Sequence, residues 1–176
     1  MNRAVIIAVS VLAGITLAKL PQWYNQPEPA SNHVVAVSKA DTGMNTAIAQ
    51  AKRSLPVFLA HVLNSSGSMT TPSTIKVAMP TTGGESDIEH IWVMPFRRLP
   101  DGTFSGELNN HPSHLGSLAF GDTIRFSQDQ ISDWALERPD GLVYGDYTTR
   151  VLLALGDGVP NGPKYSTQPV PEDWKE

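Results

Sequence analysis

Cysteine is absent from the 176 residues of this sequence. Its absence excludes disulfide bonds, thiolate nucleophiles, zinc–thiolate and iron–sulfur sites, and a lipid-modified cysteine after a leader. Basic clusters are absent as well: no five-residue window holds more than two basic residues, and the formal net charge is −4. Because phosphate binding requires clustered Lys and Arg, the sequence argues against nucleic acid as a partner. The patterns G-x-S-x-G, G-x-G-x-x-G and the Walker sequence are also missing.

Charged residues are scarce, at 17%, whereas apolar residues make up 40% of the chain. This balance predicts a packed core rather than a disordered chain. The length of 176 residues suits one ordinary domain. Fourteen prolines and fourteen glycines favour turns and short strands over a helical bundle.

The N-terminus has the pattern of an export signal. Residues 1–3 are positively charged, and residues 4–18 are apolar except for three small or polar positions. This pattern predicts a secretory signal peptide cleaved after Ala18, and therefore a periplasmic or secreted protein. The alternative is an uncleaved anchor in the inner membrane, although the run is short against the roughly 20 residues that a spanning helix needs.

Residues 19–40 follow as a proline-rich linker with a short strand predicted at 33–37. Three prolines between residues 20 and 32 oppose both helix and sheet. From Asp41 the period changes, because apolar residues recur every three or four positions up to Val62. This spacing predicts an amphipathic helix capped near Asp41, with a bend or restart at Pro56. His61 lies in its last turn, where an imidazole suits the helix dipole.

The rest of the chain predicts short strands joined by turns. A Ser/Thr/Gly-rich loop precedes the first strand, and a Pro-Asp-Gly turn joins the last hairpin. Pro112 favours a helix start within residues 109–118. Residues 147–155 fit a strand or a short helix equally well, and residues 156–176 read as an irregular tail. The strands are expected at 74–79, 88–96, 103–108, 123–127, 131–136 and 142–144.

These elements predict an α+β domain, in which one N-terminal amphipathic helix packs on a twisted, mainly antiparallel sheet. The turn at Gly121-Asp122, entering an alternating strand, is typical of a sheet that can curl towards a small barrel.

An ordered set of short motifs resembles a known family. The set runs from Glu89-His90-Ile91-Trp92-Val93 through the Gly106 hairpin, Gly121-Asp122 and Ile131-Ser132-Asp133-Trp134 to Gly145, Tyr147-Thr148 and Arg150. This order resembles the YegJ-like family, a bacterial domain of unknown function numbered 2314. The likeness covers about residues 47–155, within a domain placed at 41–155. It implies an N-terminal export signal and supplies no activity.

Glu89 and His90 lie on opposite faces of the predicted strand, so they cannot jointly hold one metal or proton. His90 shares its face with Trp92 and is expected to be half-buried beside it. Glu89 is expected to cap a strand end or to pair with a base. A structural role is favoured for both residues.

Two motif matches are weak. His111 and His114 have the H-x-x-H spacing, but no third ligand is local, so a polar loop is favoured over a zinc site. Ser73 and Lys76 match S-x-x-K, but Ser73 opens a strand and no Lys-Thr-Gly follows, so the match is attributed to chance.

Four residues form the most informative set: Asp133, Trp134, Tyr147 and Arg150. Arg150 beside a buried Asp133 predicts a bidentate ion pair that joins two segments. The two aromatic residues would add apolar area with a polar tip. The cluster is expected to lock the core, with a partner-binding groove and catalysis as alternatives.

The function expected from these observations is non-enzymatic binding of a protein partner in the bacterial envelope, in one version an immunity-type protein that blocks a toxin. The mild acidity would suit a basic partner. No cofactor or metal is expected, and contact with the membrane is expected only through the N-terminal segment, if it is not cleaved. The alternative is a hydrolase that uses Glu89, His90 or Asp133 with a metal or water.

Overall fold

The computed structural model describes residues 4–8, 34–38, 41–83, 86–155 and 162–175, the first two ranges as backbone only. The predicted leader, apart from residues 4–8, and the proline-rich segment 20–32 lie outside the described residues. Export and the domain limits at residues 18 and 40 stay predictions.

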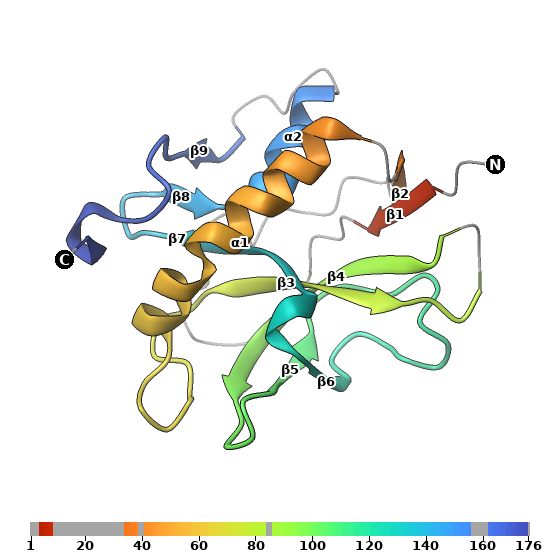
Figure 1. Ribbon diagram of the computed structural model, residues 1–176, viewed down its shortest axis with the longest axis horizontal. Coiled ribbons are helices and arrows are strands. Elements are labelled where there is room, and N and C mark those ends of the chain that lie inside the picture. Colours follow the sequence, from red (N-terminus) through yellow and green to blue (C-terminus); the bar gives the residue numbers. More distant parts are fainter. Residues whose placement is uncertain (1–3, 9–33, 39–40, 84–85, 156–161, 176) are drawn as a thin grey trace.

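The described chain forms one mainly antiparallel sheet with helices packed against it (Figure 1). The path through the sheet is β2-β1-β4-β3-β7-β8-β9, and β5 and β6 branch from β4. Only the β1–β4 and β8–β9 pairings in this path are parallel. The predicted α+β class is confirmed. The sheet stays open, so the suggested curl towards a small barrel is not found. The strands are β1 (Ala4–Ala8), β2 (Val34–Ser38), β3 (Thr74–Pro80), β4 (Ile88–Arg98), β5 (Phe104–Leu108), β6 (Thr123–Phe126), β7 (Ile131–Glu137), β8 (Leu142–Gly145) and β9 (Lys164–Tyr165).

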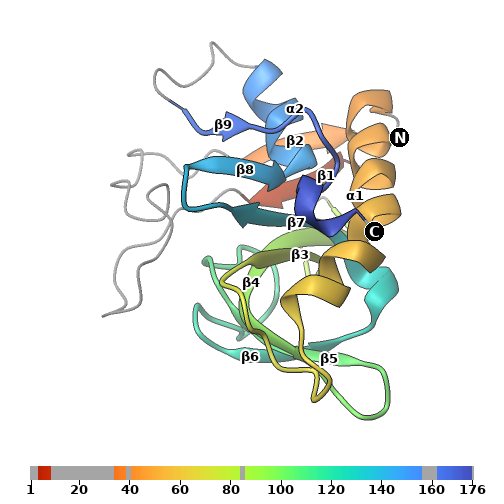
Figure 2. The same ribbon diagram turned by 90° about the vertical axis from the view of Figure 1, so that its left-hand side faces the viewer.

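Helix α1 (Thr42–Val62) covers one face of the sheet (Figure 2). Asp41 caps it, because its Oδ1 accepts a hydrogen bond of 2.8 Å from the Met44 amide. The expected restart at Pro56 is wrong: α1 continues through this residue. No helix in the described part of the chain is long and apolar enough to cross a membrane.

The core lies between α1 and the sheet and is centred on Trp134. The ring of Trp134 is fully buried and stacks on Phe58 with centroids 4.5 Å apart. Its Nε1 donates to the Ala51 carbonyl and to Ser54 Oγ, at 3.2 and 3.1 Å. A buried indole therefore keeps a hydrogen-bond partner while it fills the space under the helix.

The C-terminal part of the chain returns across the domain. Residues 147–155, for which strand and helix were both open, form helix α2 (Tyr147–Leu155). Within the predicted tail lie β9 and the short 3-10 helix η3 (Glu172–Trp174). Trp174 stacks on His61 at the end of α1, with centroids 4.6 Å apart. Residues 162–175 therefore form a C-terminal strap held against α1, β8 and α2.

The helix start predicted within residues 109–118 is wrong. Residues 109–118 form an irregular loop. A short 3-10 helix, η2 (Gln128–Gln130), occurs only later, just before β7. The loop amides are used by β4 instead: Asn109 N donates to the Trp92 carbonyl at 2.8 Å. Pro112 can start a helix but cannot impose one when tertiary contacts take the neighbouring backbone groups.

Two glycines with positive φ allow a matched test of packing at the start of α2. A Cβ at Gly145 (φ 71°) would lie 2.9 Å or less from the Trp134 ring and would overlap its carbonyl, whereas a Cβ at Gly141 (φ 79°) meets nothing within 4 Å. We expect Gly141→Ala to cost about 1–2 kcal/mol, from the left-handed backbone alone. Gly145→Ala should cost at least about 2 kcal/mol more because of overpacking. Urea unfolding measures both, and equal losses would contradict the described contact.

Candidate functional site

A row of polar side chains lies on the face of the sheet that points away from α1. In the strand register, Lys76 of β3 stands opposite Trp92 of β4 and opposite Asp133 of β7. Side chains in register on neighbouring strands point the same way, so the three are neighbours. Lys76 and Asp133 are both fully buried. An ammonium and a carboxylate without access to solvent each require compensation from their surroundings.

The carboxylate of Asp133 accepts hydrogen bonds from the N-terminus of α2. Its Oδ1 accepts from the amides of Trp134 and Tyr147 at 2.8 and 3.3 Å. Its Oδ2 accepts from the amide and the hydroxyl of Thr148 at 2.7 and 2.6 Å. The first amides of a helix have no partner within the helix, and the helix dipole favours negative charge there. Asp133 therefore caps α2 from a neighbouring strand.

Lys76 supplies the positive charge of the cluster. Its Nζ donates to Thr148 Oγ1 at 2.7 Å and lies 4.3 Å from the centre of the Trp92 ring. Burial lowers the pKa of Lys76, and the charges of Asp133 and Asp146 act in the opposite direction. Thr148 Oγ1 thus accepts from the lysine and donates to Asp133, so it connects the two buried charges.

The predicted ion pair between Asp133 and Arg150 is wrong. Arg150 donates from Nη1 to the Ser166 carbonyl at 2.8 Å, and its Nε and Nη2 have no hydrogen-bond partner among the described residues. The guanidinium lies between two rings, 5.2 Å from Tyr147 and 4.5 Å from Tyr165. Because residues 147–155 are helical, the amides of the first turn occupy the carboxylate and Arg150 faces the C-terminal strap instead.

Asp146 lies at the junction of β8 and α2 in a left-handed conformation, with φ 54°. Its Oδ2 accepts a hydrogen bond of 2.8 Å from the Tyr165 hydroxyl, and its Oδ1 is buried without a partner in the described part of the chain. Burial raises the pKa of Asp146 to about 6, against the opposing charge of Lys76. Burial also raises the pKa of Tyr165, and the neighbouring Asp146 charge adds to this rise.

His90 lies on the same face of the sheet as Lys76 and Trp92, as its strand position predicts. It is buried rather than half-buried, and its imidazole contacts Ser132, which the sequence did not predict. His90 Nδ1 and Ser132 Oγ are 2.7 Å apart, and Ser132 Oγ lies 3.2 Å from the Lys76 carbonyl. Burial lowers the pKa of His90 to about 4, and the nearby charge of Lys76 adds to this effect. The imidazole is therefore neutral at pH 7. Both side chains are buried, so a substrate atom could not reach the serine without a rearrangement.

Glu89 is fully buried on the other face of β4 and organises a loop. Its two carboxylate oxygens accept hydrogen bonds from the amides of Ser113 and His114, at 2.7 and 2.8 Å. The sequence predicted a strand-end cap or a basic partner, whereas the carboxylate binds two backbone amides of residues 109–118. His111 is exposed and its ring packs against Phe120, with centroids 5.5 Å apart.

The structure thus brings Asp133, Tyr147 and Arg150 to the start of α2, and it places His90 and Trp92 beside Lys76 on the same sheet. Trp134 lies under α1, and its ring also meets the Tyr147 ring edge-on with centroids 6.2 Å apart, so it stays beside the predicted cluster. Glu89 lies under the loop. Within the described ranges, no group of three or more His, Cys, Asp and Glu side chains could hold a metal ion.

Sequence reasoning missed four members of the cluster: Lys76, Ser132, Asp146 and Thr148. Lys76 offered a signal, because it is a lone charge inside an otherwise apolar strand, TIKVAM. A charged residue in such a strand needs a buried partner. The other three residues carry no local pattern that distinguishes them from ordinary turn and strand residues.

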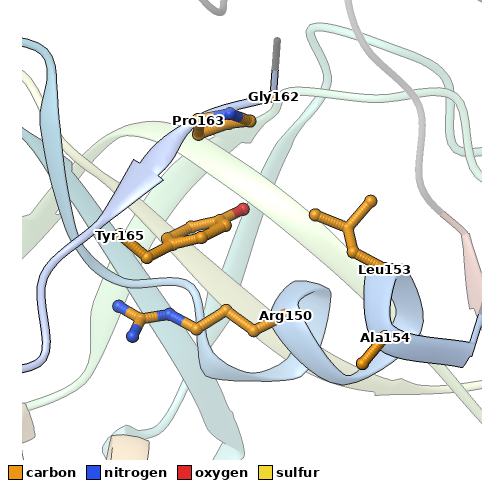
Figure 3. Close-up of a pocket in the computed structure, with 6 residues that line it drawn as sticks. All are labelled: Arg150, Leu153, Ala154, Gly162, Pro163 and Tyr165. Atoms are coloured by element: carbon orange, nitrogen blue, oxygen red, sulfur yellow. The ribbon is translucent and has the colours of Figure 1, made fainter. Parts of the chain in front are cut away.

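A pocket of about 390 Å³ lies beside this cluster, between α2 and the start of β9 (Figure 3). Leu153 and Ala154 form one side, and Pro163 and the ring of Tyr165 form the other. The stem of Arg150 passes under the Tyr165 ring, with its guanidinium directed away from Leu153. The pocket therefore combines the apolar side chains of Leu153, Ala154 and Pro163 with polar surface from Arg150 and Tyr165.

We expect Asp133→Asn to destabilise the protein more than Lys76→Met. The asparagine points its carboxamide NH2, a hydrogen-bond donor, at groups that also donate, and it leaves the buried ammonium of Lys76 without a carboxylate. Such a loss costs about 3–5 kcal/mol. In Lys76→Met, the Asp133 carboxylate keeps its four hydrogen-bond donors. Chemical denaturation of both variants measures the difference, and the reverse order would contradict the assigned roles.

Two buried groups should give opposite pH dependences of stability. The pKa of Asp146 rises from 3.8 to about 6 on folding, so its contribution to stability falls as the pH rises through this range. The pKa of His90 falls from 6.5 to about 4 on folding, so its contribution rises with pH through the same range.

Relative to the wild type, Asp146→Asn should therefore make the free energy of unfolding rise more steeply between about pH 4 and pH 6, by at most about 1.4 kcal/mol per pH unit. His90→Asn should make the free energy of unfolding rise less steeply with pH than in the wild type over the same range. Urea titrations at fixed ionic strength measure the slopes, and slopes that stay unchanged in both variants would contradict the described burial.

Comparison with known proteins places the chain in a family without assigning a function. It is 29% identical over 110 residues to the "Uncharacterized protein YegJ" of Escherichia coli (strain K12). The aligned region covers 62% of this chain and 67% of that protein. No solved structure matches the chain. The family described as "Uncharacterized protein conserved in bacteria (DUF2314)" matches residues 41–155, which include α1, β3 to β8, the buried cluster and α2. The chain therefore belongs to the bacterial DUF2314 family.

Proposed function

We propose that this protein is exported to the bacterial envelope and binds a protein partner there without catalysing a reaction. Export rests on the positively charged start and the apolar run of residues 4–18, which have the pattern of a signal peptide. The structure describes only part of that segment, so the support comes from the sequence.

One observation carries the binding part of the proposal. The three residues offered for catalysis, Glu89, His90 and Asp133, are engaged inside the fold, whereas the C-terminal half of α2 leaves apolar side chains at the surface. Asp133 caps α2, Glu89 holds loop amides and His90 contacts Ser132. In contrast, Leu155 is 67% exposed and follows Leu153 and Ala154 at the pocket.

This pocket suits an apolar side chain of the partner. Leu153, Ala154 and Pro163 would release water on contact, and the ring of Tyr165 offers a flat face. Tyr165 is held in place by the Arg150 guanidinium, 4.5 Å from its ring, and by its hydrogen bond to Asp146. A rigid aromatic side chain beside a pocket with apolar walls is typical of the centre of a protein interface.

The proposed partner is an envelope protein, and an immunity-type role against a basic toxin is one concrete form. The formal charge of −4 becomes one unit more negative if residues 1–18 are removed with Arg3. A negative protein attracts a basic partner and speeds their encounter. Leu153, Ala154 and Pro163 at the pocket would then supply the contacts that persist after the encounter.

A hydrolase built on Glu89, His90 or Asp133 is the weaker alternative. Glu89 lies on the opposite face of β4 from His90. The carboxylate of Asp133 accepts four hydrogen bonds from its own chain, so its lone pairs are engaged.

Photo-crosslinking in the bacterium that encodes the protein would test the proposal. We expect a crosslinking residue at Ala154 to give one discrete adduct in the envelope fraction, and a residue at Ala60 on the exposed side of α1 to give none. Both positions are exposed alanines on helices, so the pair is matched. The substitution Leu155→Asp should remove the adduct without changing stability by more than about 0.5 kcal/mol.

Two outcomes would contradict the proposal. Equal adducts at Ala154 and Ala60 would show that contact at α2 is not specific. Recovery of the full chain in the cytoplasmic fraction, with residues 1–18 still present by intact mass, would contradict export.

A further inference from the structure

The outer edge of β4 is covered by three different segments. Toward its C-terminal end, β4 pairs with β5 through Val93 and residues 96–98. At Trp92 the loop of residues 109–118 covers the edge: the Trp92 amide donates to Asn110 Oδ1 at 2.7 Å, and the Trp92 carbonyl accepts from Asn109 N. At the N-terminal end, Glu89 and His90 pair with β1, which runs parallel to β4.

The strand in this last position comes from the predicted leader. The β1 residues Ile6 and Ile7 stand opposite Glu89 and His90, and β1 lies within the segment 1–18 that cleavage after Ala18 would remove. The other edge of β4 is paired with β3 over residues 88–93 and is not available. Removal of the leader would therefore leave the outer backbone groups of β4 near Glu89 and His90 without the strand that covers them.

We infer that the edge of β4 at residues 88–91 is a strand-acceptor site, which takes an extended apolar segment of a partner protein in parallel orientation. An edge strand with unpaired N–H and C=O groups is a template for strand addition. The segment that fills this edge within the chain, AVIIA, consists of five apolar residues. Once that segment has been removed, the edge of β4 binds an apolar extended segment of another chain in its place.

This inference rests on the proposed export with cleavage, but it concerns a surface different from the α2 pocket. The edge belongs to β4, whereas the pocket is lined by α2 and the residues around β9. One other segment of the chain could compete for the edge: β2 pairs with β1, with Ala36 opposite Ile6, and could move across to β4 when β1 is lost. The two occupants give different results in the experiment below.

The experiment uses the exported chain purified from the periplasm after expression with its own leader. The probe is a fluorescent peptide with the sequence of residues 2–10, NRAVIIAVS. We expect intact mass to show the loss of residues 1–18 and fluorescence anisotropy to show saturable binding of the peptide. A peptide with N-methyl groups at the positions of Ile6 and Ile7 should bind at least tenfold more weakly, because N-methylation removes backbone donors and obstructs strand pairing.

Hydrogen exchange locates the bound peptide. We expect saturating peptide to slow amide exchange in residues 88–91 at least tenfold and to leave residues 147–155 unchanged. The full chain produced in the cytoplasm with its leader intact should not bind the peptide, since β1 already fills the edge. The variant Leu155→Asp should bind the peptide as the wild type does, which separates this site from the pocket.

Several results would overturn the inference. A processed chain that does not bind the peptide, or that protects α2 instead of residues 88–91, refutes the acceptor site and leaves the proposed function in place. Residues 88–91 that are equally protected in the processed and unprocessed chains without peptide show that β2 closes the edge. A leader that remains on the exported chain refutes both the acceptor site and the cleavage on which it depends.

Discussion

The structure depends on one buried carboxylate. Asp133 accepts the first amides of α2 and the hydroxyl of Thr148, and the ammonium of Lys76 on the adjacent strand balances its charge. A helix N-terminus, a carboxylate and an ammonium are each costly to bury alone. Together they satisfy one another, and this fixes α2 at one position on the sheet.

That position determines which surfaces remain for function. Because α2 starts at Asp133, Arg150 and Tyr147 turn toward the C-terminal strap, where Arg150 contacts Tyr165 and the Ser166 carbonyl. The strap lies beyond the part of the chain that the family covers, yet it forms one side of the pocket. The opposite side is the apolar C-terminal half of α2. The pocket is thus a consequence of how the buried charges place the helix.

The polar side chains that drew attention in the sequence stabilise internal structure. Glu89 holds a loop through two amides, His90 is kept neutral by burial beside Ser132, and Asp133 caps a helix. In each case the residue type suited catalysis, and the contacts around it decide its role. These internal roles are the reason why we propose binding at the surface of α2 and at the edge of β4.

The sequence by itself determined the elements whose signals are local. The apolar spacing from Met44 to Val62 and the cap at Asp41 predicted α1, and alternation with turn residues predicted the strands and hairpins, because both patterns follow from the geometry of a few consecutive residues. Only the tertiary structure decided the partner of Asp133, the helical state of residues 147–155 and the loop around Pro112. Each of these depends on which distant strand lies alongside, and no short-range pattern encodes that register.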